Sequence, residues 1–509
     1  MAIVKVDNLG QLGVVADQAP AELPLNAWTA ASNIRFRDGY AERFRGQQAI
    51  LTTPTITPYW VQHYSTTAAR FLVYAGLTKV YTDNGTTVTE ITGTAKTGAI
   101  DDRWTGGALN GVLITNNGVD KPEYSNGTSA LATLTGWGAT WKAASVRPFK
   151  NYLVALDVTK GATRYPHMVK WSHAAEPGTI PTSWDETDPS KDAGEVDLAE
   201  TPGLMVDCLP LGDANIIYKE DGAWAQTYIG PPFIWRFQRL PGSYGLLARG
   251  CVVQTPKGHV ALTPGDVVLH TGGEPQSILT ARMRRWLFAN MDSIYYKRSF
   301  VTLNPGRNEV WVCFPYLGDS TCTRALIWNW VDNTFGVRTL TATTYGATGL
   351  VNYSTSTGWS SDPETWAQDG SLWNQDEFSP NEQRLVLCQT TPALSQVDAG
   401  VTFNGSSVTA SLERTGLHFD APDRVKTIRS IFPRIEATLG TTIQIEVGSA
   451  MRAEEAPTYG SPVTFTVGTS RQVDAFASGR FLAVRFSSTS DQPWRMKAYE
   501  VDLIVNGRY

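Results

Sequence analysis

The side chains best placed to do chemistry lie in two irregular segments of the sequence. The first, residues 174–202, is rich in carboxylates, and the candidates among them are Asp185, Glu186, Asp188, Asp192, Glu195 and Asp197. Such a run could bind Ca²⁺, or supply the acid and the nucleophile of a glycosidase if two carboxylates converged. An acidic, proline-rich loop is more often simply solvated, and we favour that interpretation.

The second irregular segment, residues 355–382, contains three tryptophans at seven-residue spacing. They could form a sugar-binding platform, but repeated apolar side chains in a loop favour a protein interface. The stretch SSDPETW weakly resembles the Asp-box turn of sialidase propellers, but it lacks the glycine and is one residue short. Both segments are long enough to serve in docking or gating. The candidate interaction or gating residues are Trp184, Asp185, Asp188, Trp359, Trp366 and Trp373.

No other pattern indicates catalysis. The six histidines are scattered without a metal-binding spacing, and the GxSxG, GxxxxGK[ST] and GxGxxG motifs do not occur. The five cysteines are widely spaced, odd in number and without a CxxC pair, which favours free thiols in a reducing cytoplasm. We therefore predict a protein that is not an enzyme, with no catalytic residue, cofactor or metal site.

Composition points to a β-rich chain of more than one domain. The 509 residues exceed one ordinary core, and 42% hydrophobic residues, 45 glycines and 17 tryptophans suit many short strands and turns. With 43 basic and 48 acidic residues, the net charge of −5 gives no global attraction to nucleic acid. Neither a signal peptide nor a run of eighteen apolar residues is present, so we expect neither standard export nor a membrane span.

A hairpin pattern recurs about seven times along the chain. Each copy has an apolar strand, a tight turn and a second strand. The copies lie at residues 70–85, 111–127, 151–172, 215–230, 257–273, 308–330 and 383–398.

Several hairpins are flanked by a further strand on each side, which gives four antiparallel strands per unit. One four-stranded sheet cannot bury both of its faces, so such units stack around an axis until a ring closes. We predict an all-β protein with a β-propeller of about seven blades, with six as the alternative. The tryptophans in the strands should fill the gaps between blades: Trp224, Trp235, Trp311, Trp328 and Trp330.

The predicted organisation has three parts. Residues 1–50 form an extended N-terminal arm and a first strand, residues 51–420 form the propeller, and residues 421–509 form a β-sandwich-like module of alternating strands. Residues 407–417 are expected to provide the fourth strand of the last blade. Whether a strand of the arm completes that blade stays open.

The segment AELPLNAWTAASNIRFRDGYAERFRGQ, residues 21–47, is distinctive. It resembles the entry segment of the tail nozzle proteins of short-tailed bacteriophages, of the tubular protein B type and the related tail hub or stabilisation proteins. The resemblance continues in IIYKEDGAWAQTYIGPPFIWRFQRLPGSYGLLARG and in GRFLAVRFSSTSDQPWRMKAYEVDLIVNGRY. It covers most of the chain as short motifs, without an active-site signature.

This resemblance implies a structural virion protein with a propeller body. Six copies would form a ring below the adaptor proteins of the portal, retain packaged DNA and conduct double-stranded DNA during ejection, through a hole between subunits rather than through one propeller. The implied partners are further copies of the chain, the adaptor proteins, tail fibres or spikes, and a distal needle or tip protein. The implied location is the virion tail, assembled in the bacterial cytoplasm. The alternative is a propeller-fold tail protein that binds or hydrolyses glycans.

Overall fold

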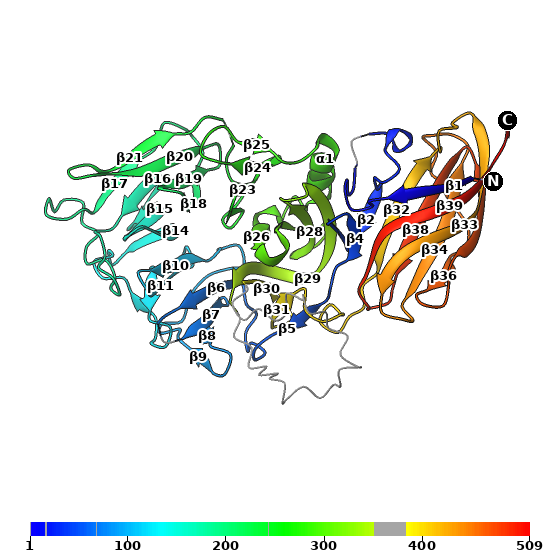
Figure 1. Ribbon diagram of the computed structural model, residues 1–509. Coiled ribbons are helices and arrows are strands. Elements are labelled where there is room, and N and C mark those ends of the chain that lie inside the picture. Colours follow the sequence, from blue (N-terminus) through cyan, green and yellow to red (C-terminus); the bar gives the residue numbers. More distant parts are fainter. Residues whose placement is uncertain (1, 16–17, 68, 243, 351–382, 509) are drawn as a thin grey trace.

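The computed structural model describes residues 2–15, 18–67, 69–242, 244–350 and 383–508, and its larger part is a ring of antiparallel sheets (Figure 1). Five of these sheets are separate four-stranded blades, each paired in sequence order.

The strands of these five blades have the following bounds. Blade 1 is β6 (Trp60–Ser65), β7 (Arg70–Ala75), β8 (Val80–Asp83) and β9 (Val88–Glu90). Blade 2 is β10 (Thr105–Leu109), β11 (Val112–Asn116), β12 (Glu123–Ser125) and β13 (Ala132–Thr133). Blade 3 is β14 (Trp141–Phe149), β15 (Tyr152–Lys160), β16 (Thr163–Trp171) and β17 (Gly194–Asp197). Blade 4 is β18 (Met205–Leu211), β19 (Ala214–Lys219), β20 (Ala223–Gly230) and β21 (Ile234–Arg239). Blade 5 is β22 (Val252–Thr255), β23 (Gly258–Thr263), β24 (Asp266–His270) and β25 (Gln276–Ser277).

The last two blades share one long strand. Blade 6 is β26 (Phe300–Asn304), β27 (Glu309–Pro315), β28 (Cys322–Asn329) and the first part of β29 (Thr334–Gly349). From Thr343 onward, β29 becomes the first strand of blade 7 and pairs with β30 (Arg384–Gln389). β31 (Ala393–Val397) follows, and β5 (Gln47–Ala49) pairs with it as the fourth strand. A strand of the N-terminal arm therefore completes the last blade.

The innermost strands form a closed circle. Each first strand contacts the first strand of the next blade, from β6 through β10, β14, β18, β22 and β26 to β29, and β29 contacts β6. The propeller prediction is confirmed, and the number of blades is seven. Each hairpin of the sequence pattern supplies the second and third strands of one blade. The five strand tryptophans named above are all buried, as the pattern predicted.

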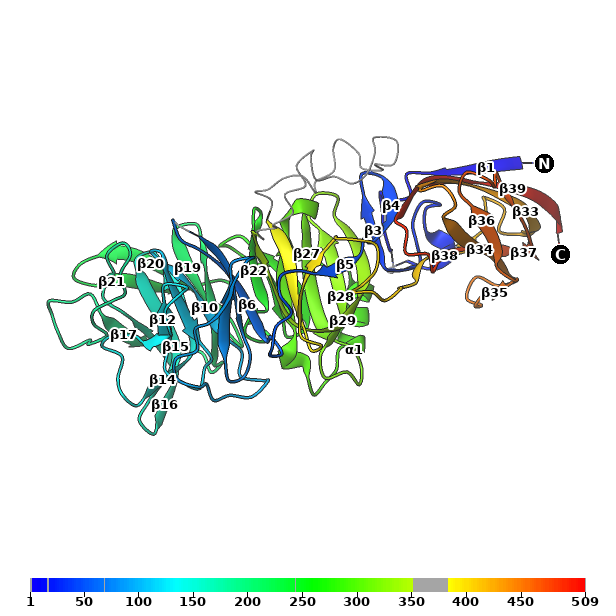
Figure 2. The same ribbon diagram turned by 90° about the horizontal axis from the view of Figure 1, so that it is seen from below.

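A two-sheet sandwich lies beside blade 6 (Figure 2). One of its sheets continues from β29 through β3 (Ile34–Arg37), β4 (Tyr40–Arg43), β39 (Trp494–Arg508) and β33 (Arg424–Ala437) to β37 (Val473–Gly479), with β1 (Ala2–Asp7) also paired to β39. The other sheet contains β2 (Ala30–Ser32), β32 (Ala410–Leu417), β38 (Phe481–Ser488), β34 (Thr442–Ala450), β35 (Thr458–Tyr459) and β36 (Val463–Thr466). Apolar side chains from both sheets, among them Trp28, Phe486 and Tyr499, form one buried core. Both chain ends lie on the sandwich, away from the propeller.

Two details of the predicted organisation differ from the structure. The strand within residues 407–417 was expected in the last blade, but β32 pairs with β2 and β38 in the sandwich. The first fifty residues are not only an arm, since β1 to β4 belong to the sandwich sheets. Alternation of apolar residues predicts a half-buried strand but not its partner, so the sequence pattern could not assign these strands to a sheet.

Helices are few in the described part of the chain. α1 (Ala281–Asn290) lies in the connection between blades 5 and 6 and buries Met283 and Leu287. The remaining helices are three 3₁₀ turns, η1 (Pro20–Glu22), η2 (Tyr296–Arg298) and η3 (Pro305–Arg307). In the ranges described, no helix has the length and apolar character needed to cross a membrane.

Candidate interaction surfaces and the propeller axis

The order of the strands divides the blade connections between two faces of the propeller. The connections between first and second strands of a blade, and those between third and fourth strands in blades 1 to 6, leave on one face, called face 1. Second-to-third connections and blade-to-blade connections leave on the other, called face 2. The acidic segment joins β16 to β17 and therefore belongs to face 1. α1 joins blade 5 to blade 6 and belongs to face 2.

Trp184 is not a surface residue, contrary to its selection as an interaction candidate. Only 1% of the residue is exposed, and its ring packs edge-on against Trp137, with 4.7 Å between ring centroids. Both tryptophans belong to the core between blades 2 and 3. The acidic segment is thus anchored by an aromatic side chain that returns to the blades.

Asp185 is exposed and Asp188 is half-buried, and both serve in local turns. The carboxylate of Asp185 accepts hydrogen bonds from the backbone N–H and hydroxyl of Thr187, and that of Asp188 accepts the same pair from Ser190. In the described ranges, no group of three or more histidine, cysteine, aspartate or glutamate side chains is arranged to hold a metal ion. These two carboxylates therefore cap turns and do not converge on a site.

Two other carboxylates of the segment do converge, on a buried amine. The Nζ atom of Lys170, which is fully buried, lies 2.6 Å from Glu186 and 2.9 Å from Glu195. Burial raises the pKa of Glu186, but hydrogen bonds from Lys170 and Lys160 outweigh it, and the pKa falls to about 2. Glu186 is thus held as an anion, and its pairing with lysines, together with that of Glu195, anchors the segment to blade 3.

The remaining candidates, Trp359, Trp366 and Trp373, lie outside the described residues. An apolar hairpin tip between β20 and β21, on face 1, was not among the candidates predicted from the sequence. There the exposed fractions are 46% for Tyr228, 52% for Ile229 and 75% for Phe233. The signal was available in the letters TYIGPPF, because this turn carries apolar side chains where polar ones are usual.

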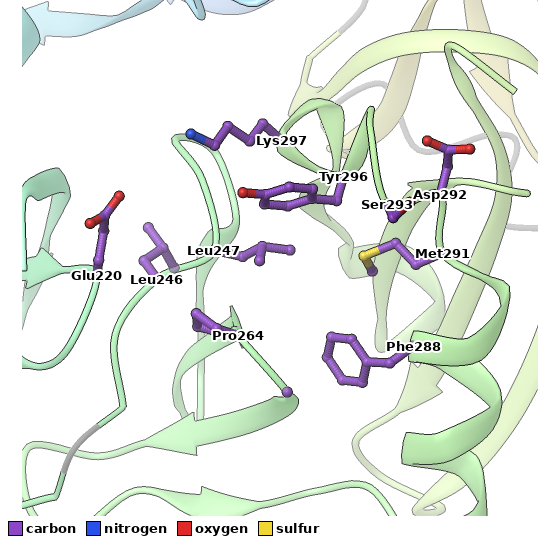
Figure 3. A pocket seen from close by; sticks show the side chains of 11 residues that line it. Glu220, Leu246, Leu247, Pro264, Phe288, Met291, Asp292, Ser293, Tyr296 and Lys297 are labelled. Atoms are coloured by element: carbon purple, nitrogen blue, oxygen red, sulfur yellow. The ribbon is translucent and has the colours of Figure 1, made fainter. Parts of the chain in front are cut away.

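A groove opens on face 2 between blades 4 and 5 and the connection that contains α1 (Figure 3). Its cavity has a volume of about 530 Å³. Apolar side chains dominate the lining, with charged groups at its edges, and the lining includes Leu246, Leu247, Pro264, Phe288, Met291, Tyr296, Glu220, Asp292 and Lys297. Two exposed apolar residues lie beside the groove, Ile294 with 74% and Leu317 with 55% of the residue exposed. The lining residue Asp292 holds both nearby, because its carboxylate accepts the N–H of Ile294 and that of Gly318, which follows Leu317.

The propeller axis is crossed by charged side chains near face 2. Arg147 forms a two-bond ion pair with the fully buried Asp207, at 2.9 and 2.7 Å. Arg249 precedes blade 5, yet its Nη1 donates across the ring to the carbonyl oxygens of Ala144 and Arg103, at 2.7 and 3.3 Å. These contacts join the inner ends of blades 2, 3, 4 and 5. They also place side chains across the ring's own central opening.

No protein-family model matches the chain, and no curated protein matches it. Among solved structures, the WD40 β-propeller domain of Doa1 is 10% identical, with a TM-score of 0.35 over 70% of this chain and 97% of that chain. The β-propeller domain of Myceliophteria thermophila Cps50 (Swd1) is 7% identical, with a TM-score of 0.40 over 69% and 98%. The computationally designed Ika8 protein is 9% identical, with a TM-score of 0.37 over 69% and 99%. Such low values support no argument, and the propeller is assigned from its strand pairing.

Proposed function

We propose that this chain is a structural subunit of a phage-type tail nozzle. Six copies would form a ring below a portal adaptor, in the virion tail, and DNA would pass between the subunits. The proposal rests on the sequence resemblance, and one structural observation supports it most. The distinctive segment, residues 21–47, is one of two stretches by which the chain crosses between the domains, the other being residues 398–409.

That segment contributes a strand to each layer of the junction. β2 enters one sandwich sheet, β3 and β4 lie between β29 and β39 in the other, and β5 begins at its end and completes blade 7. Because the same segment both closes the propeller and enters the sandwich, the two domains are held by paired backbone. A subunit that bears the load of packaged DNA needs this kind of coupling.

Charged contacts reinforce the junction. Arg35 on β3 is almost fully buried and pairs with Glu309 of blade 6 at 2.8 Å and with Asp398 beside blade 7 at 2.9 Å. One sandwich-side arginine therefore holds two blades. The blocked propeller axis also suits a nozzle in which DNA passes between subunits.

Exposed apolar side chains on opposite faces supply what a ring requires. Face 1 carries the tip with Ile229 and Phe233, and face 2 carries the groove with Ile294 and Leu317 beside it. Closed rings form from two different surfaces on each subunit. The presence of exposed apolar side chains on both faces therefore supports head-to-tail assembly of identical chains.

Native mass spectrometry and electron microscopy of the full chain, alone and with its adaptor ring, test the proposal. We expect particles of six chains with a central hole. The variant Phe233→Ser should reduce assembly at least tenfold with an unchanged melting temperature, because the side chain is 75% exposed in the free chain. Leu439→Ser, at an 80% exposed sandwich position, is the matched control and should assemble normally. A chain that stays monomeric with the adaptor present, or that cleaves glycans, would contradict the nozzle.

A further inference from the structure

Two guanidinium groups at the propeller axis have no acidic partner among the described residues. Arg103 is 8% exposed; its Nη1 donates to the carbonyl oxygen of Thr344 at 3.3 Å, and its Nη2 has no partner. Arg249 uses only Nη1, on two carbonyl oxygens, which leaves its Nε and Nη2 donors free in the described structure. Arg249 is half-buried, whereas Arg103 is a buried charge without an opposite charge, which is strongly unfavourable.

Asp207, the carboxylate that the described residues place at the axis, does not neutralise them. Asp207 is fully buried and already accepts hydrogen bonds from Arg147, from the Ser145 hydroxyl and from the backbone N–H groups of Cys208 and Gly250. Two further carboxylates act on Arg249 from a greater distance. Of these, Asp157 is bound by Arg164 through two bonds, and Asp102 accepts the N–H of Ala99.

Tyr345 and Gly118 lie against these two arginines. Arg103 lies over the ring of Tyr345, with 5.5 Å between its guanidinium carbon and the ring centroid, and the Tyr345 hydroxyl makes no hydrogen bond among the described residues. Gly118 allows Arg249 to cross the axis, since a Cβ at this position would lie 2.6 Å from Nη1. Burial lowers the pKa of Arg249, and the charge of Arg103 lowers it further. The first effect is expected when a cation is withdrawn from water, and the second when another cation lies nearby.

We propose that the axis binds a small tetrahedral oxyanion of the phosphate class, held by Arg103, Arg249 and the hydroxyl of Tyr345. Guanidinium groups bind such anions through paired N–H donors, and the anion would offset the charge that Asp207 leaves uncompensated. We assign free inorganic phosphate rather than a phosphate of duplex DNA, because Arg103 is only 8% exposed and lies out of reach of a duplex. The site links blades 2, 5 and 7, so the bound anion stabilises the closed ring.

The test is the melting temperature and binding calorimetry of the full chain in sodium phosphate, against sodium chloride of equal ionic strength. Phosphate at ten times its dissociation constant should raise the melting temperature by about 2 °C. Tyr345→Phe removes one hydroxyl and should weaken phosphate binding by about tenfold. Arg249→Gln should abolish binding, and Arg249→Lys, which keeps the charge, should restore part of it. Arg236→Gln, an exposed position on β21, is the control and should bind normally.

Three outcomes would overturn the proposal. One is an equal melting temperature in phosphate and chloride. Another is phosphate binding that Tyr345→Phe and Arg249→Lys leave unchanged. The third is displacement of bound phosphate by a short DNA duplex, which would mean that phosphate binds at an open surface and not at the axis. Assembly into rings is not measured here, so the result is independent of the nozzle proposal.

Discussion

At the scale of single residues, this protein uses buried charges and aromatic rings where strands of different sheets meet. Lys170 gathers two carboxylates beneath the acidic segment, and Asp207 joins four groups near the axis. Such groups stabilise the fold only when their partners are present, because a buried ion that loses its partner is costly. Substitution of one charged partner should therefore destabilise the fold more than substitution of an exposed charged residue.

Trp184 provides the first residue-scale prediction. We expect Trp184→Ala to lower the free energy of unfolding by about 3–5 kcal/mol, because it removes a buried indole that packs on Trp137. Glu176→Ala, at an exposed position in the same segment, should change it by less than about 0.5 kcal/mol. Urea denaturation measures both. Equal stability of the two variants would mean that Trp184 is exposed and not part of the core.

Glu186 provides a pH-dependent prediction. Its folded pKa of about 2 lies below the ordinary value of 4.5, so its contribution to stability is complete above pH 4.5 and is lost as the pH falls toward 2. We expect Glu186→Gln to be less stable than the parent chain at pH 7, with a difference that shrinks through this window. Denaturation at pH 7, 4, 3 and 2 measures it. The exposed control Glu454→Gln should show no such convergence, and a constant deficit for Glu186→Gln would refute the ion pair.

At the scale of elements, two strands complete the ring of blades. β29 closes blade 6 and opens blade 7, and β5 completes blade 7 from the far end of the sequence. β5 has only three residues, but the N–H groups of Gln47 and Ile50 donate to the carbonyl oxygens of Thr402 and Leu394, both at 2.8 Å. These bonds fix the strand on both sides, so the ring is closed by a firmly held segment.

Hydrogen exchange tests that closure. β9 is a suitable reference, since it is also a three-residue outermost strand but follows directly in its own blade. We expect the amides of Gln47 and Ile50 to exchange within tenfold of the rates for β9 and its neighbour Ile91, whose N–H donates to Val80. Much faster exchange at Gln47 and Ile50, with β31 still protected, would mean that the ring opens at blade 7.

The sequence predicted those elements whose signals are local. The hairpin of residues 70–85 ends in a turn where the Asn84 carboxamide accepts N–H groups from Thr86 and Thr87, and such turn chemistry is readable in the letters. β10 was not readable, because its residues TGGAL include Gly106, where a Cβ would lie 2.2 Å from the carbonyl oxygen of Ile114. Its glycines serve a close approach and carry no apolar pattern.

The candidate surfaces were harder to predict than the strands. Trp184 stands in a polar stretch, and its burial depends on Trp137, which is 47 positions earlier. The charged groups at the axis come from four blades, so Arg103, Arg147, Asp207 and Arg249 show no common spacing. Convergence across a ring is a property of tertiary structure, and periodicity along the chain does not encode it.

At the scale of the whole molecule, one sheet runs without interruption from blade 6 into the sandwich. The crossing point is narrow, because β29 and β3 share only the pair Val337 and Ile34. The coupling of the two domains therefore depends heavily on side chains around this point. Arg35, which reaches Glu309 and Asp398 from β3, is the central one.

Arg35→Met gives the whole-molecule prediction. The substitution leaves Glu309 and Asp398 buried, 2% and 10% exposed, without their main cation, at an expected cost of about 3–5 kcal/mol. Since this cost falls at the junction, we expect calorimetry to resolve two transitions, one for each domain, where the parent chain shows one. Arg37→Met, on the same strand but paired with the 72% exposed Asp38, should keep the single transition. If Arg35→Met also unfolds in one step at the parent temperature, backbone pairing alone couples the domains, and the rigidity that we assign to the nozzle subunit does not depend on this ion network.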